Sequence, residues 1–209
     1  MDVNNVHSTF KSEFKFATFR RENLTCSNLA THIKAAATYD YPILCKSKAF
    51  YFAGHGGIDQ NQQPYFNAVS ETNKVISVQK HILTFFRSTN YKPSDSFVFF
   101  FDCCLSSGQT TTTHERKPFA FEIPLRCLVA FATSPGLTSS GTSNEGGQYT
   151  KVLCENLRKS QKSDTLTSIL DKTHNAVMQV SDRAQPPQYS SCVGPIYLRG
   201  IHTNQSCYY

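Results

Sequence analysis

The stretch FVFFFD, residues 97–102, decides the fold class of this chain, because five consecutive apolar residues lead into an acidic one. The stretch AFYFA at residues 49–53 has the same uninterrupted apolar character. Strands without polar alternation are typical of a mainly parallel sheet that is covered on both faces. Both stretches are therefore predicted to be buried strands, and Pro93 ends any preceding helix before the second of them.

Helical periodicity surrounds these two strands. Val3, Val6, Phe10 and Phe14 recur at spacings of three and four, which places them on one face of a helix at the start of the chain. Ser77 is a predicted N-cap for the helical segment 78–87. Further helices are predicted at residues 24–37, 148–160 and 164–180, and further strands at residues 15–19, 127–133 and 195–199.

The order of these elements predicts an α/β sandwich with a largely parallel central sheet. A length of 209 residues fits one domain. The polar segments 59–73 and 134–147 are predicted to be loops, and segment 106–118 is predicted to be an exposed loop without fixed structure.

Composition narrows the function classes. The formal charge is +6, but the 21 Lys and Arg residues occur in ones and twos, which predicts a solvated surface and no nucleic-acid partner. The longest apolar run is far shorter than the roughly 20 residues that a membrane span needs. The chain start does not read as a signal peptide, and eight cysteines without one indicate free thiols in the cytoplasm. No CxxC pair supports a zinc site.

The two apolar strands each end in residues that can carry chemistry. AFYFA leads to His55 between glycines, and FVFFFD leads to Cys103 and Cys104. Because the carboxyl ends of parallel strands meet at one edge of a sheet, His55 can act as general base and acid for a Cys104 nucleophile. The N–H groups of Gly56 and Cys104 are the natural donors to an oxyanion. The sequence thus predicts a cysteine hydrolase.

Each of these residues has a structural alternative. A cysteine in a buried strand is commonly an inert small apolar residue, and a single histidine can simply belong to a loop. Cys103 competes with Cys104 in principle, but strand alternation puts Asp102 and Cys104 on one side and Cys103 on the other. The other weighed histidines, at positions 32, 81, 114 and 174, fall in predicted helices or in the 106–118 loop.

With these motifs the sequence resembles the caspase-like cysteine peptidases, and among them the metacaspase, paracaspase and bacterial branch. YFAGHG at 51–56 matches the histidine motif, and DCC at 102–104 matches the Asp-x-Cys motif. His55 precedes Cys104 by 49 positions (104 minus 55), close to the spacing of about 50 in caspases. The Gln-Ala-Cys-Arg-Gly block of true caspases is absent. Further resemblance lies in residues 131–141, 145–157 and 185–198, the last matching the family's final strand.

The resemblance implies a three-layer α/β/α sandwich that lacks the family's first strand, since the chain opens at the helix that comes after it. It implies one peptidase domain over residues 1–209, with a large-subunit-like segment over residues 1–108, a flexible linker over 109–124 and a small-subunit-like segment over 125–200. The implied activity is that of a cysteine endopeptidase with a His55–Cys104 dyad. Asp102 would line the pocket for a substrate Arg or Lys.

The resemblance also bears on cofactors and partners. Only Asp59 represents the acidic clusters of calcium-dependent relatives, so no metal or other cofactor is expected. The expected partner is a protein or peptide substrate, with dimerisation through the last strand as a further expectation. No membrane contact is expected.

Three alternatives to an Arg/Lys-specific peptidase stay open at the level of sequence. A catalytically inactive regulatory partner is supported by the missing strand. Leu105, where metacaspases commonly have His, is a further departure from the family. An Asp-specific caspase and a different hydrolase on a related fold are the other two alternatives.

Overall fold

The computed structural model describes residues 2–38, 47–67, 75–88, 96–106, 122–139, 141–142 and 146–199. Its main sheet has four strands: β1 (Ser47–Ala53), β5 (Ser96–Asp102), β6 (Cys127–Phe131) and β9 (Gln188–Ser191), in the order β1-β5-β6-β9. The first three are parallel to one another, and β9 is antiparallel to β6.

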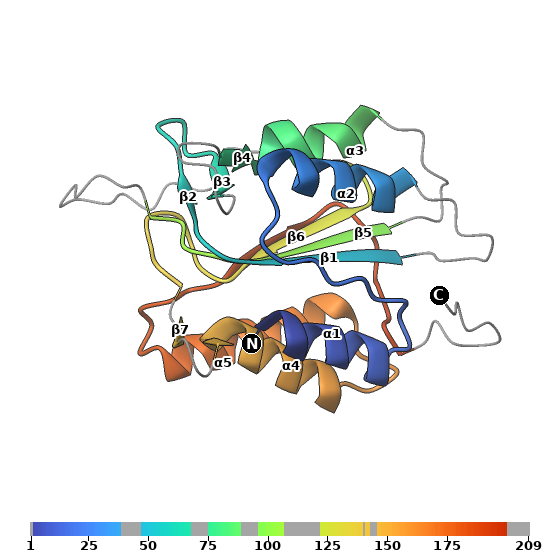
Figure 1. Cartoon of the computed structure of the whole chain (residues 1–209). Helices are drawn as coiled ribbons and strands as arrows, with labels where there is room; N and C mark the ends of the chain where they lie inside the picture. The colour runs from blue at the N-terminus through green and yellow to red at the C-terminus, as the bar shows by residue number, and fades with distance from the viewer. Residues whose placement is uncertain are drawn as a thin grey trace.

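Helices cover both faces of this sheet (Figure 1). One face carries α2 (Cys26–Thr38), the π-helical turn η1 (Val78–Leu83) and α3 (Thr84–Ser88), and the other carries α1 (Asp2–Glu13), α4 (Gln148–Lys159) and α5 (Leu166–Val180). The predicted α/β fold with a mostly parallel sheet flanked by helices is therefore confirmed.

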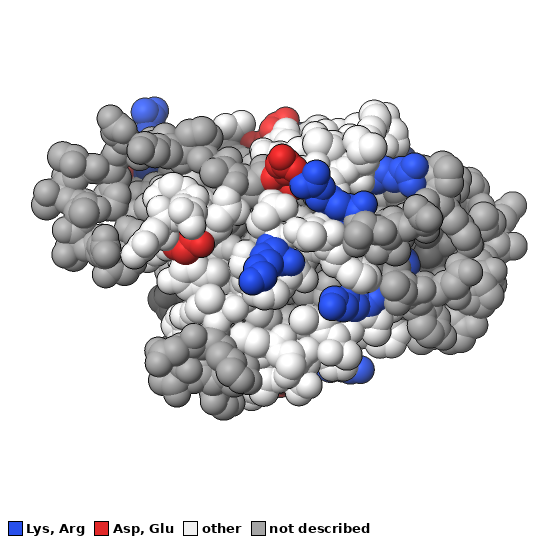
Figure 2. Space-filling model, turned by 90° about the horizontal axis from the view of Figure 1, so that it is seen from above, with Lys and Arg blue, Asp and Glu red and all other residues white. Residues whose placement is uncertain are grey.

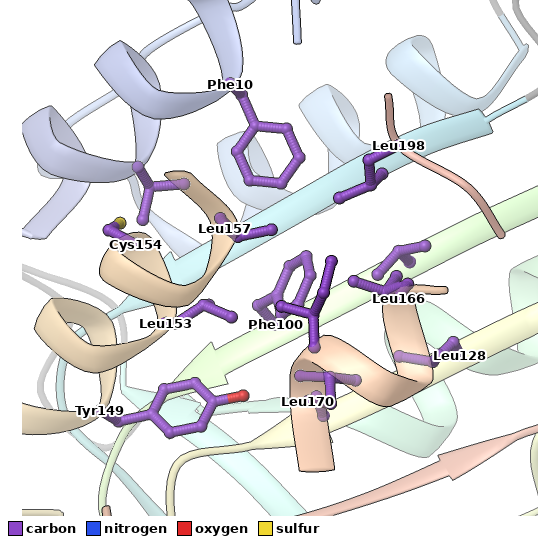
Figure 3. Close-up of a cluster of buried hydrophobic side chains, with 14 of the residues drawn as sticks. Phe10, Phe100, Leu128, Tyr149, Leu153, Cys154, Leu157, Leu166, Leu170 and Leu198 are labelled. Atoms are coloured by element: carbon purple, nitrogen blue, oxygen red, sulfur yellow. The ribbon is translucent and has the colours of Figure 1, made fainter. Parts of the chain in front are cut away.

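Strand β5 is the centre of the core, and all seven of its residues are buried. Phe97, Phe99 and Phe101 pack in the cluster beneath η1 and α3, which we call the upper core cluster. Val98 and Phe100 pack in the cluster formed with α1, α4 and α5, which we call the lower core. Figure 3 shows Phe100 among side chains from these helices. Because burying one Phe side chain contributes about 1.5–3 kcal/mol, this apolar run fixes β5 between the two helical layers.

A second, three-stranded antiparallel sheet comes directly after β1. It consists of β2 (Gly56–Ile58), β3 (Pro64–Asn67) and β4 (Val75–Ser77), and a separate short pair joins β7 (Gly141–Thr142) to β8 (Gly146–Gly147). The prediction of a loop over residues 59–73 is therefore wrong where β3 lies. Phe66 is the reason, because its ring is 1% exposed and stacks on Phe52 within the upper core.

Most predicted helices are found close to their expected bounds. The N-cap prediction is confirmed, since the Ser77 hydroxyl accepts a hydrogen bond from the Lys80 N–H at 3.1 Å. The helix after it begins as the π-helical turn η1 before continuing as α3.

The strand predicted at residues 15–19 is absent. Lys15 has a left-handed φ of 57°, and the Phe16 N–H donates to the Phe10 carbonyl, so the chain turns directly after α1. Phe14 is fully buried, and Phe16 packs against the same core cluster, so apolar packing beneath the sheet replaces strand pairing. Within the described residues, β1 is consequently an edge strand of the main sheet.

The strand predicted at residues 195–199 is also wrong, because the last strand lies earlier, at Gln188–Ser191. Ile196 and Leu198 are buried in the core beside α5, and the Leu166 N–H donates to the Ile196 carbonyl. Their alternation therefore reflects packing against a helix. The true strand is polar because it is a half-exposed sheet edge.

Most of the predicted 106–118 loop and of the 109–124 linker falls in residues 107–121, outside the described residues. In the described part of the chain, no helix is long and apolar enough to cross a membrane. In the view from above, the described Lys and Arg side chains lie in separate small groups (Figure 2). That face thus presents no continuous basic patch among the described residues.

Stability should depend on pH through His174 of α5. The ring lies between Tyr149 and Tyr189, and its buried Nε2 has no hydrogen-bond partner among the described residues. Burial lowers the pKa of His174 from 6.5 to about 4, opposed by nearby Asp171. The unfolded chain binds a proton at His174 more readily than the folded chain does. The contribution of His174 to stability is therefore fully present above its unfolded pKa of 6.5, and it is lost progressively as the pH falls to about 4. With about 1.4 kcal/mol per pKa unit, the loss from pH 7 to pH 5 is about 2 kcal/mol.

Urea unfolding of the wild type and of His174→Phe at both pH values measures this contribution. The variant should lack the His174 part of the pH dependence, whereas His32→Gln, at an exposed position of α2, should keep it. Equal pH dependence in the wild type and His174→Phe would contradict the prediction.

Candidate active site

The ends of β1 and β5 bring the predicted catalytic residues to one edge of the sheet. The two strands pair in register up to Ala53 opposite Asp102, and the Gly54 N–H donates to the Asp102 carbonyl at 3.2 Å. His55 and Cys104 each lie two residues beyond this last pair. His55 is exposed, and Cys104 is half-buried. The local pairing thus sets both side chains at the carboxyl ends of adjacent parallel strands.

The β2–β3 ladder fixes the backbone around the histidine. The Asn67 N–H donates to the His55 carbonyl at 2.9 Å, and Gly56 stands opposite Phe66 in the next position of the antiparallel register. Because hydrogen-bonded and non-hydrogen-bonded pairs alternate along an antiparallel ladder, the Gly56 N–H points away from β3. The Gly56 N–H is therefore not used in the β2–β3 ladder.

Two glycines are required here by space. A Cβ at Gly56 would lie 2.8 Å from the Tyr65 carbonyl oxygen and 2.9 Å from the Cys103 Sγ. At Gly57 it would lie 2.7 Å from the Tyr65 hydroxyl. Neither glycine has a positive φ, so glycine is required at both positions by close contact with neighbouring atoms and not by a left-handed backbone.

The adjacent cysteines differ in environment as strand alternation predicts. Cys103 is 2% exposed and belongs to the upper core cluster, and burial raises the pKa of its thiol far above the usual range. The Cys104 Sγ lies on the other side, where it donates to the Ser139 carbonyl at 3.8 Å. Cys103 is thus held as a buried neutral thiol, while Cys104 faces the loop after β6.

Asp102 is a buried carboxylate held by hydroxyl groups. It accepts from the Ser139 Oγ at 2.8 Å and from the Thr150 Oγ1 at 2.5 Å, and the Tyr51 hydroxyl contacts the same Thr150 oxygen. Burial raises the pKa of Asp102, while the hydrogen bonds from Thr150 and Ser139 oppose that rise. None of the ion pairs between described residues includes Asp102. The Asp102 carboxyl group therefore has no partner cation among the described residues.

A second carboxylate lies on the same side of the site. Asp2, at the start of α1, accepts the Gly147 N–H at 2.7 Å, and its charge contributes to the raised pKa of Asp102. Gly146 has a φ of 79°, and a Cβ at Gly147 would collide with the Asp102 carboxylate. The two glycines before α4 thus let two carboxylates approach one backbone segment.

The loop after β6 is tied to the cysteine strand. The Gly136 N–H donates to the Leu105 carbonyl at 2.8 Å, and the Leu105 N–H donates to the Leu137 carbonyl at 2.9 Å. The buried Gln185 amide donates to the Ala132 carbonyl at 2.9 Å and to the Ser139 Oγ at 3.4 Å. Ser139 is therefore the residue through which this loop contacts both Cys104 and Asp102.

Sequence reasoning missed the four residues that build this environment: Asp2, Ser139, Thr150 and Gln185. The polar loop 134–147 was a visible signal for Ser139, and an acidic residue at the start of the first helix was one for Asp2. Gln185 gave none, because its role depends on where the chain returns after α5.

Metal-ligand groups are sparse near the site. Among the described residues, no three His, Cys, Asp or Glu side chains gather as a metal-binding group. Asp59 accepts from the Asn61 and Gln63 N–H groups at 2.8 and 2.9 Å, so it closes its own turn.

Comparisons with known proteins agree on the type of domain. The family model described as "Caspase domain" matches residues 1–194. Among solved structures, the chain is similar to caspase-1 from Spodoptera frugiperda, with a TM-score of 0.74 and 18% sequence identity over 98% of this chain and 82% of that chain. A search of curated proteins gives no match. At this identity the structural likeness shows the fold.

The steric role of Gly56 can be tested by adding one methyl group. Gly56→Ala should destabilise the fold by about 1–3 kcal/mol, because overpacking against the Tyr65 carbonyl and Cys103 forces the strands apart. Gly194→Ala is the matched control, since a Cβ there meets nothing within 4 Å and its effect should stay within about 0.5 kcal/mol. Thermal unfolding compares them, and equal stability of the two variants would refute the packing argument.

Proposed function

Because this chain belongs to the caspase domain family, we propose that it is an active cysteine endopeptidase with His55 and Cys104 as its catalytic dyad. The observation that carries the proposal is the β1–β5 register, which sets an exposed imidazole and a half-buried thiol after neighbouring strands. A dyad of this type needs the two side chains on separate, rigid elements that converge at one edge.

The proposed reaction rests on the chemistry of these two groups. His55 accepts the thiol proton, and the Cys104 sulfur attacks the carbonyl carbon of the scissile peptide bond. The C–N bond breaks as His55 returns the proton to the leaving amine, which leaves a thioester on Cys104. Water, deprotonated by His55, then attacks the thioester and releases the acid product with the free thiol.

Two backbone N–H groups are proposed to stabilise the oxyanion that forms during each attack. The Gly56 N–H points away from the β2–β3 ladder, and the Cys104 N–H belongs to the nucleophile itself. Fixed backbone donors suit this role because they need no reorganisation as charge develops. The tight packing of Gly56 against Cys103 supports it by keeping the donor near the cysteine strand.

We further propose that the enzyme cleaves after Arg or Lys. Asp102 and Asp2 bring two carboxylates together, and no described ion pair neutralises Asp102. The Arg or Lys side chain of a substrate would supply a cation beside these carboxyl groups, whereas a substrate Asp would be repelled. A charge-assisted contact is worth about 1.5–3 kcal/mol, which corresponds to about tenfold or more in preference, since 1.4 kcal/mol is a factor of ten.

Other finer assignments rest on the resemblance. The Asp-x-Cys motif at 102–104, in place of a Gln-Ala-Cys-Arg-Gly block, supports the metacaspase-like branch. Free thiols support a cytoplasmic location. The β9 edge of the main sheet would supply the surface for dimerisation through the last strand.

A regulatory partner without activity is the second candidate function. The observation in its favour is that β1 forms an edge of the main sheet within the described residues, where relatives are expected to continue with a further strand. A wall of the substrate pocket would then be missing. Activity measurements on the purified chain separate the two candidates.

Replacing either member of the dyad should abolish peptidase activity while the fold persists. Cys104→Ala and His55→Ala should each lower kcat/KM by roughly 10³-fold or more, as losses of nucleophile and base do in other peptidases. Cys103→Ala is the control, because its buried thiol lies on the opposite side of the strand.

A peptide chloromethyl ketone with a terminal Arg gives a second measurement. It should label the wild type and Cys103→Ala but not Cys104→Ala, as read by intact mass. Turnover by Cys104→Ala would overturn the dyad, and a folded wild type that neither turns over nor labels would favour the regulatory partner.

Specificity should depend on the charge of Asp102. In a panel of fluorogenic peptides, the wild type should prefer Arg or Lys over Asp, and Asp102→Asn should lower the Arg preference about tenfold or more. Asp182→Asn, at an exposed position after α5, is the charge-matched control and should leave the preference unchanged. Cleavage after Asp, or full Arg preference in Asp102→Asn, would show that Asp102 does not set specificity.

A further inference from the structure

We propose that Cys127 and Cys192 form a reversible disulfide that links β6 to the segment leaving β9. Both residues lie in the small-subunit-like segment of the chain, and neither belongs to the candidate site. The proposal does not depend on peptidase activity.

The register of β6 and β9 places the two cysteines opposite each other. The last assigned pair is Leu128 with Ser191, so the next position along the ladder joins Cys127 to Cys192. The Cys192 N–H donates to the Cys127 carbonyl at 2.8 Å, and the Arg126 N–H donates to the Cys192 carbonyl at 2.8 Å. These bonds hold the cysteine backbones side by side beyond the strand itself.

The spacing of such a pair is compatible with a disulfide. Opposed residues of an antiparallel ladder have Cα atoms about 4.5–5.5 Å apart and side chains on the same face. A disulfide accepts Cα separations of about 4.4–6.8 Å. Arg126 has a φ of 66° and both it and Cys127 stand near Cys192, so the local twist is that of a bulge rather than of a rigid flat ladder.

The two thiols differ in access, which sets the order of reaction. Cys192 is exposed, whereas Cys127 is fully buried in the upper core cluster. Burial, with a contribution from the nearby Cys192 thiol, raises the pKa of Cys127 to about 12. An oxidant must therefore react first at Cys192, and closure by Cys127 should be the slower step.

A small disulfide such as oxidised glutathione is the oxidant class that fits this order. The Cys192 thiolate attacks one glutathione sulfur, which expels one glutathione thiolate and leaves a mixed disulfide. The Cys127 sulfur, after losing its proton to the released thiolate, attacks the Cys192 sulfur and expels the second glutathione. Two protein thiols are oxidised by two electrons, and one oxidised glutathione becomes two reduced ones.

The bond would act on the edge of the sheet. Strand β9 contacts the rest of the main sheet through β6. The segment after it carries Ile196 and Leu198 into the lower core. A disulfide between Cys192 and Cys127 would hold this segment to the start of β6, at the end of the sheet opposite to the candidate site. Oxidation should therefore raise the unfolding temperature by several degrees.

The experiment uses Cys104→Ala, so that oxidation of the proposed nucleophile does not enter the result. This protein is incubated with oxidised glutathione, quenched by alkylation and analysed by intact mass and peptide mapping. We expect transient glutathione on Cys192, then loss of two hydrogens with a Cys127–Cys192 crosslinked peptide, a higher unfolding temperature, and reversal of both by dithiothreitol.

Cys192→Ser in the same background tests the assignment without disturbing the core, since position 192 is exposed. It should show neither the crosslink nor the thermal shift, whereas Cys26→Ser, a half-buried cysteine of α2, should keep both. Glutathione that stays on Cys192 without closure, a crosslink that joins other cysteines, or equal behaviour of the Cys192→Ser variant would each overturn the proposal. Loss or retention of peptidase activity in the wild type has no bearing on it.

Discussion

The in-register pairing of β1 with β5 is the interaction on which the rest of the structure depends. It runs from Ser47 opposite Ser96 to Ala53 opposite Asp102, and it ends at the same level in both strands. The segments that leave the two strands therefore lie side by side at one edge of the sheet. One carries the glycine-flanked His55, and the other carries Cys103 and Cys104. The close contact between Gly56 and Cys103 continues this pairing past the end of the sheet. A larger residue at Gly56 would separate the two segments that a dyad needs together.

The regions of the fold that could be predicted are those where burial on both sides dictates composition. FVFFFD has no solvent face to encode, so its apolar run identified a central strand. The prediction that AFYFA is also a buried strand was wrong, because β1 is a half-exposed edge strand, but the ends of the two strands still identified the candidate site. The failures have the opposite cause. β9 is a half-exposed edge and reads as polar, while Ile196 and Leu198 alternate because they pack against α5. KFATF has strand-like composition, but after the turn at Lys15 its Phe16 packs beneath the sheet, while Phe19 is exposed.

Long-range contacts explain why the surroundings of Asp102 could not be predicted. Thr150 comes from α4, Ser139 from the loop after β6, and Gln185 from the turn after α5. Each is an ordinary polar residue in its own sequence context. They meet because the sheet order places β6 beside β5, while α4 packs below it. Periodicity describes one element at a time, whereas a buried carboxylate is satisfied by hydroxyls from several elements.

Neighbouring thiols in this fold differ in burial. At the end of β5, strand alternation turns Cys103 into the upper core and Cys104 toward Ser139, so Cys103 is buried whereas Cys104 is half-buried. At the start of β6, Cys127 also faces the upper core, and its antiparallel neighbour Cys192 meets solvent where the sheet ends. Since a thiolate reacts only where it can be reached and ionised, the more accessible member of each pair meets an outside reagent first. The two more accessible thiols differ in their neighbours. Cys104 follows β5, which pairs with the strand that leads to His55, whereas Cys192 is hydrogen-bonded through its backbone to Cys127. The more accessible thiol at the carboxyl end of the sheet is thus the proposed nucleophile, and the one at the opposite end is the proposed site of thiol exchange.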